Sequence, residues 1–304
     1  MRWRRIIVSF IALILVGLVF LYWMFPLENI DFGMGSSRNY NFSLGTSNES
    51  MQFYPNMRYP TPNISYTISN DCTISKKDEA TRAFEILEND TILHFYPVSD
   101  NGEISVSCQD KNVVKGRLFI AGEGGPVDIV QSGVFNIIFN GSVLLIRNTD
   151  CGTPNVAIHE ILHTLGFNHS ENPNNIMYPV TSCGQTIGQD TLDTINSLYS
   201  VPSLSDLLFT NVSATMNGRE INLQMVIKNY GLVDSGPARI IVTADGKQIQ
   251  NISLDSLEVG NGRIITINNI FTLQRNIKEI RFFIESDFEE LEKTNNEAIL
   301  NYPS

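Results

Sequence analysis

Three of the chain's four histidines, His159, His163 and His169, stand within eleven residues. His159 and His163 are four apart, so in a helix they lie one turn apart on one face and can bind a single ion. Gly166 is suited to reverse the chain and bring His169 back, because glycine accepts positive φ at little cost. Three neutral imidazoles with one open position are the donor set of a catalytic zinc. The competing interpretation is a buried helix with hydrogen-bonded core histidines.

The residues around these histidines resemble a known family. The run His-Glu-Ile-Leu-His-Thr-Leu-Gly-Phe-Asn-His matches the metzincin signature His-Glu-x-x-His-x-x-Gly-x-x-His. Residues 175–179, Asn-Ile-Met-Tyr-Pro, resemble the Met-turn of that family. Ser170 and the run at 188–199 are similar to the matrixin branch. The resemblance covers about residues 51–200.

This resemblance implies a zinc endopeptidase acting on protein or peptide substrates. Glu160, directly after the first ligand, would be the general base for zinc-activated water, and its competing role is a helix salt bridge. Met177 would lie beneath the zinc, although methionine also fills ordinary cores. The wall of the substrate pocket would be formed by Tyr178, Pro179 and Val180.

Other expectations concern the substrate strand and further metals. Residues 142–147 and 117–121 are both candidates for a strand that pairs with substrate main chain, and the sequence does not choose between them. A second, structural zinc is not expected, because only His94 remains as a further histidine. A Ca²⁺ site built from Asp and backbone carbonyls is left open.

The composition narrows the class of protein. The chain has 304 residues, 42% of them hydrophobic, and a formal net charge of −11. The length suits an anchor and two domains of ordinary size. The negative charge argues against nucleic acid as a partner, because nucleic acid requires a basic surface.

The cysteines predict disulfides. Cys72, Cys108, Cys151 and Cys183 include no CxxC pair, so a cysteine zinc site is not expected. Their even number favours two disulfides outside the cytosol, with three pairings open. We prefer Cys72–Cys108 and Cys151–Cys183, since the second would join the entry of the zinc helix to the loop after residues 175–179. Four buried thiols are the alternative.

The N-terminus predicts a membrane anchor. Three arginines in residues 1–5 precede twenty uncharged residues at 6–25, which is long enough to cross a bilayer. The arginines should stay in the cytoplasm and place the rest of the chain outside. A cleaved signal peptide is the competing interpretation, but no Ala-x-Ala-like site follows. Residues 26–50 are rich in Asn, Ser and Gly and predict a flexible tether.

The elements that position the zinc motif follow from residue 51. Helices are predicted at 75–87, 155–165 and 187–200, and residues 122–126 are predicted to form a loop. Asn140-Gly141 predicts a hairpin turn between two apolar strands. Strands are predicted at residues 63–68, 91–96, 103–107, 117–121, 133–139 and 142–147.

The last hundred residues predict a different domain. Short strands separated by turns, without a helical period, are typical of a β-sandwich. Asn229-Tyr230-Gly231 and the acidic run that ends in Asn295-Asn296 resemble CARDB domains, a family of Ig-like surface modules. The resemblance suggests a surface ligand, and a spacer is the alternative. The seven strands are predicted at 211–216, 221–229, 238–244, 247–253, 262–271, 278–286 and 296–301.

The predicted fold class is α+β. A zincin-like (metzincin) domain, with a twisted mixed sheet and three helices, is followed by an Ig-like sandwich and preceded by one transmembrane helix. We expect a single-pass cell-membrane protein with its catalytic domain outside. The alternative is a surface binding protein whose metzincin domain is silent. The predicted segments are a basic stub at 1–5, anchor at 6–25, tether at 26–50, peptidase at 51–200, linker at 201–206 and sandwich at 207–304.

Overall fold

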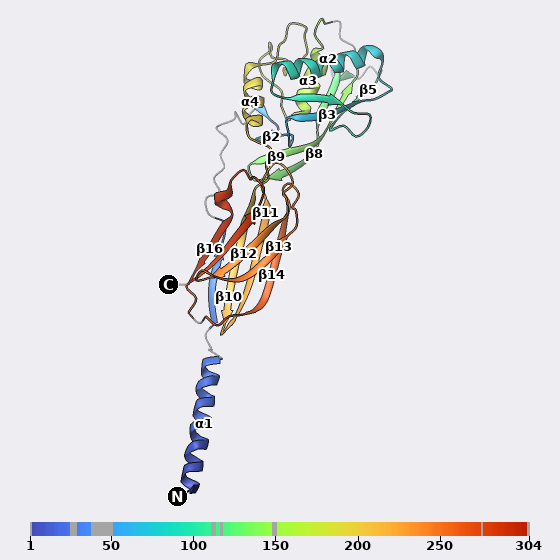
Figure 1. The fold of residues 1–304 in the computed structure, drawn as a ribbon. Coiled ribbons are helices and arrows are strands. Elements are labelled where there is room, and N and C mark those ends of the chain that lie inside the picture. The colour runs from blue at the N-terminus through green and yellow to red at the C-terminus, as the bar shows by residue number, and fades with distance from the viewer. Residues whose placement is uncertain are drawn as a thin grey trace. The chain divides into compact units, whose positions relative to one another are not determined.

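The computed structural model divides the chain into two compact units (Figure 1). One unit, which contains the sandwich, comprises Met1–Tyr40, Asp206–Asn229 and Asp234–Ser304. The other, which contains the histidines, comprises Asn41–Ser205 and Tyr230–Val233. The structure describes residues 2–24, 29–37, 51–110, 114–115, 118–147, 151–274 and 276–302.

The chain begins with a long helix, α1 (Arg2–Met24). No helix in the described part of the chain combines the length and the apolar character needed to cross a membrane. The transmembrane span predicted at residues 6–25 is therefore not supported.

The sandwich unit consists of two antiparallel sheets of four strands. One has the order β1-β10-β11-β14 and the other the order β13-β12-β15-β16, and their buried residues form one hydrophobic cluster. All seven predicted strands are present. They are β10 (Leu207–Asn217), β11 (Glu220–Asn229), β12 (Ala238–Ala244), β13 (Lys247–Leu254), β14 (Gly262–Phe271), β15 (Glu279–Ser286) and β16 (Glu297–Asn301), with the 3₁₀ helix η2 (Lys293–Asn295) before the last.

The eighth strand, β1 (Asn29–Gly35), corrects the prediction of a tether at 26–50. It pairs antiparallel with β10, and Phe32 enters the sandwich core with 6% of its surface exposed. The hydrogen bonds of the sheet and the burial of this ring outweigh the polar composition that suggested a flexible segment. Residues 26–28 and 38–50 of that prediction lie outside the described residues.

The histidine unit is built on a mixed sheet of order β2-β9-β5-β3-β4, with β8 paired to β9. Every pairing in it is parallel except β8 with β9. The strands are β2 (Met57–Arg58), β3 (Asn63–Ile68), β4 (His94–Pro97), β5 (Ile104–Cys108), β8 (Gly122–Ser132) and β9 (Phe135–Leu145). A separate two-stranded ribbon pairs β6 (Val114–Lys115) with β7 (Leu118–Phe119). Strand β7 lies within the strand predicted at 117–121, of which residue 117 is outside the described residues.

The hairpin of this sheet differs from the prediction. Strand β9 runs straight through Asn140-Gly141, and the turn lies instead at Gly133, whose φ is 57°. A Cβ on Gly141 would come within 2.7 Å of Thr164 and Tyr59, so this glycine permits close packing rather than a turn. The predicted loop at 122–126 forms the first half of β8.

Three helices complete the unit: α2 (Ile74–Asp90), α3 (Asn155–Thr164) and α4 (Gln189–Ser200). Helix α2 is capped by Thr73, whose side chain accepts a hydrogen bond from Lys76 N. All ten residues of α3 are buried, including its polar residues, so those polar side chains need partners inside the protein. Helices α2 and α3 pack against each other, with α3 also against β8 and β9 (Figure 1).

Candidate metal centre

Helix α3 and the reversal after it bring the three histidines together. His159 Nε2 lies 3.0 Å from His163 Nε2, which lies 3.2 Å from His169 Nε2. Four-coordinate zinc with Zn–N bonds of about 2.0–2.1 Å separates its nitrogens by roughly 3.3 Å. The three donor atoms are therefore spaced as ligands of one zinc ion.

Backbone carbonyls fix the state of the two buried imidazoles. Nδ1 of His159 lies 2.6 Å from Ile176 O, and Nδ1 of His163 lies 2.7 Å from Phe167 O. A carbonyl oxygen only accepts, so both Nδ1 atoms donate and the Nε2 lone pairs are free to bind a metal. Lone pairs converging at this distance repel one another unless a cation lies between them, which is the chemistry of a metal site.

Burial also favours neutral imidazoles. It lowers the pKa of His163 to about 4 and lowers the pKa of both His159 and His169. Neutral imidazole is the form that binds metal. His159 and His163 are buried, whereas His169 is exposed.

The reversal that carries His169 is a Schellman motif. Gly166 has φ of 92° and donates its N–H to His163 O, while Phe167 N donates to Leu162 O. A Cβ on Gly166 would lie 2.7 Å from the Cβ of Met57. Both the left-handed backbone and the close contact require glycine at this position.

Glu160 is buried beside the ligands and packs against β8. A Cβ on Gly122 would meet Glu160 Cγ at 2.7 Å, and a Cβ on Gly124 would meet Glu160 O at 2.2 Å. Burial, with a smaller effect of the Glu123 carboxylate, raises the pKa of Glu160 to about 8. A cation held by the imidazoles would favour its ionised form. The glycines of β8 were missed as site residues because their run was read as a loop.

Met177 lies in a turn that is tied to two of the histidines. Its N–H donates to Asn175 Oδ1, and Tyr178 N donates to Asn175 O. Ile176 O accepts from His159, and Met177 O accepts from Ser170 N, directly after His169. Met177 is buried, Tyr178 is half-buried, and Pro179 and Val180 are exposed.

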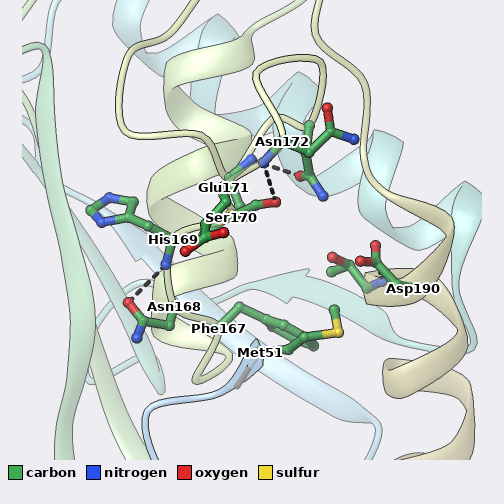
Figure 2. Close-up of a pocket in the computed structure, with 11 residues that line it drawn as sticks. Met51, Phe167, Asn168, His169, Ser170, Glu171, Asn172 and Asp190 are labelled. Carbon is green, nitrogen blue, oxygen red and sulfur yellow. Dashed lines mark hydrogen bonds between the residues drawn. The ribbon is translucent and has the colours of Figure 1, made fainter. Parts of the chain in front are cut away.

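A polar cavity of about 660 Å³ lies beside the third histidine. Figure 2 shows Asp190, from α4, across the cavity from the Ser170–Asn172 loop, with Met51 and Phe167 below. Tyr178, Pro179 and Val180 are not among its lining residues. The predicted substrate-pocket residues therefore do not belong to this cavity.

Both preferred disulfides are present. Cys72 is bonded to Cys108, and Cys151 is bonded to Cys183. The second connects the residues before α3 with the loop that follows the Met177 turn. His94, outside the centre, pairs with Glu88 at 2.6 Å.

Comparison with protein families agrees with this geometry. The family described as Matrixin matches residues 138–200, and the family described as CARDB matches residues 204–299. The chain carries a matrixin peptidase domain followed by a CARDB domain. The matrixin match covers β9 from residue 138 onward, α3 and α4, and the structure places the preceding strands in the same unit. No curated protein matches the chain.

The matrixin domain is a zinc metalloendopeptidase domain, and a peptidase domain implies protein substrates. The three-histidine cluster is consistent with its catalytic zinc.

Proposed function

We propose that this chain is an extracytoplasmic zinc endopeptidase in which Glu160 is the general base. The observation that carries the proposal is the convergence of three histidine Nε2 atoms, two of them unprotonated because Nδ1 donates to a carbonyl, beside a buried carboxylate. Zinc, when bound, supplies a Lewis acid for water and for the peptide carbonyl. Glu160 would accept the proton of the attacking water and pass it to the leaving amine. His159, His163 and His169 would hold the metal, with Met177 beneath it.

The substrate main chain would pair with β8. Strand β9 has sheet partners on both sides, β5 and β8, so residues 142–147 have no free edge to offer. Within the described residues, β8 pairs only with β9, which leaves its other edge free for an extended peptide. Glu160 packs against the start of this strand, so a paired peptide would pass close to the proposed base.

The remaining roles stay predictions. Tyr178, Pro179 and Val180 directly follow the Met177 turn, which supports a pocket wall there but does not define the pocket. Calcium binding and a surface ligand of the CARDB domain also stay predictions.

The location at a cell membrane likewise stays a prediction from the sequence. The two disulfides support the part of it that places the peptidase domain outside the cytosol, because disulfides persist in oxidising compartments.

Replacing the proposed base tests the mechanism. Glu160→Gln should keep zinc and lower kcat/KM on an unstructured protein by roughly 10²–10⁴-fold, because the amide cannot accept the proton. Glu85→Gln, the same change at an exposed position of α2, should cleave like the wild type. Glu160→Gln cleaving at the wild-type rate would falsify the proposed mechanism.

A peptide library separates the proposal from the rival function. A binding protein with a silent peptidase domain would hold zinc and cleave no member of the library. An endopeptidase should yield a defined set of cleaved bonds that disappears on chelation and returns with zinc.

A further inference from the structure

The first described residues of the peptidase unit, 51–53, run along the reversal that carries His169. Asn168 N donates to Met51 O at 2.9 Å, and Phe53 N donates to Gly166 O at 2.9 Å. Gln52 and Phe167 form the antiparallel bridge between these two hydrogen bonds. The segment thus adds a short strand to the turn between the second and third metal ligands.

The 51–53 segment is itself held in place by Gln52, which is buried. Its side-chain amide donates to Met57 O at 2.8 Å and accepts from Met57 N at 3.1 Å. Met57 in turn packs against Gly166, at the tightest point of the reversal. Through these contacts the 51–53 segment, Met57 and the reversal hold one another in place, so a shift of the segment would shift the reversal.

Phe53 also contacts a metal ligand directly. Its ring stacks on the His163 imidazole with centroids 5.7 Å apart and planes inclined by 27°. Phe53 is 39% exposed, whereas His163 is 6% exposed. The phenyl ring therefore shields the imidazole from solvent and restricts its rotation, in addition to the hydrogen bond at Nδ1.

The reversal also borders a cavity, which Met51 of the 51–53 segment lines as well. Asn168 and His169 line the cavity of about 660 Å³, together with Met51 and Phe167. Packing beside the cavity is incomplete, so the position of His169 depends on the hydrogen bonds that pair the reversal with the 51–53 segment. The cavity view shows Met51 and Phe167 adjacent at its floor (Figure 2).

We infer that the 51–53 segment is a positioning element of the metal centre, with Phe53 as the residue that fixes His163. The inference rests on the proposed function, because it concerns the same three ligands. None of these residues belongs to the zinc motif, and the Matrixin match begins only at residue 138. They act through the ligands and need not touch the substrate.

Metal retention by the full-length chain tests the inference apart from activity. Phe53→Ala should weaken zinc binding about tenfold, since residues that support metal ligands contribute on this scale. Phe53→Tyr should bind zinc like the wild type because it keeps the ring, and Phe53→Leu should fall between the two. Zinc loss to a chromogenic chelator and the visible spectrum of the Co²⁺ form report binding and ligand geometry.

Tyr54→Ala is the matched control. Tyr54 is the neighbouring aromatic residue and is 56% exposed, so its loss should leave zinc retention, the Co²⁺ spectrum and kcat unchanged. In Phe53→Ala, kcat should fall with KM little changed. The inference is wrong if Phe53→Ala retains zinc as well as Tyr54→Ala does, or if Phe53→Leu matches the wild type. A wild-type chain that binds no zinc would refute the proposed function instead.

Discussion

Arg58 places a permanent charge in the interior of the peptidase unit and pairs it with backbone carbonyls. Its guanidinium donates to Leu198 O and Val201 O, at the end of α4, and to Tyr59 O. It also lies 4.5 Å above the centroid of the Tyr199 ring. The carbonyls at the end of a helix lack intrahelical donors, so Arg58 satisfies groups that would otherwise be buried unpaired.

Removing this side chain should destabilise the peptidase unit. Arg58→Met leaves at least two buried carbonyls without donors, which should lower the free energy of unfolding by about 3 kcal/mol. Arg82→Met, at an exposed position of α2, should change it by less than about 0.5 kcal/mol. Thermal unfolding of the full chain measures both, and equal midpoints for the two variants would rule out the role assigned to Arg58.

At the metal centre, the sequence predicts only those residues that act through their side chains. The spacing of His159 and His163 follows from helix geometry, and Gly166 indicates the reversal that returns His169. Four cysteines allow only three pairings into two disulfides. The oxygens of Ile176 and Phe167, which fix the two imidazoles, are backbone atoms and leave no mark on the sequence. Phe53 gave no signal because its contact joins segments 110 residues apart in the chain (163 minus 53).

At the scale of elements, β8 approaches α3 so closely that Gly122 and Gly124 leave no room for a Cβ atom beside Glu160. Glycine and proline have low strand propensities, and the run at 122–126 is therefore predicted to be a loop. The close approach of Gly124 to the backbone of Glu160 explains why glycine is used in this strand. The turn predicted at Asn140-Gly141 is wrong for the same reason, because Gly141 is also a glycine that permits close packing within a strand. Elements with strong periodicity, such as β3 and α2, were predicted well because their burial pattern is local.

Adding a methyl group at Gly124 should push β8 and α3 apart. In Gly124→Ala the new Cβ meets Glu160 O at 2.2 Å, so β8 or α3 must shift. We expect a loss of about 1–3 kcal/mol in stability and at least a tenfold fall in kcat, because small displacements of catalytic groups are costly.

Gly125→Ala is the control for this change. A Cβ at Gly125 meets nothing within 4 Å, so this neighbouring variant should keep wild-type stability and kcat. Thermal unfolding and initial rates on one peptide compare the pair. Equal behaviour of the two variants would show that the contact between β8 and α3 does not constrain the site.

At the scale of the whole molecule, the peptidase residues stand in the sequence between the first and second strands of the sandwich. Strand β1 precedes them and β10 follows them, yet the two strands pair in one sheet. The CARDB match begins at residue 204 and so does not include β1. The sequence could not reveal this strand, because its pairing partner lies about 180 residues away and its neighbours are polar.

This connectivity predicts that a cut before the peptidase domain will not release the N-terminal segment. A protease site introduced within residues 41–48 and cleaved should yield two fragments that co-elute on size exclusion, because β1 remains bound to β10. Phe32→Ala should let them separate, since loss of a buried phenyl costs about 3–5 kcal/mol. Met34→Ala, at a position 80% exposed in the same strand, should not. Fragments that separate without any substitution would contradict the pairing.

The coordination of zinc in the full-length protein is the most direct test of the central claim. X-ray absorption at the zinc edge should show one zinc per chain with three imidazole nitrogens at about 2.0–2.1 Å and a further light atom in the open position. His169→Ala should reduce the imidazole count by one. A folded chain that binds no zinc, or that binds it with fewer than three imidazoles, would contradict the assignment of this site as the catalytic centre.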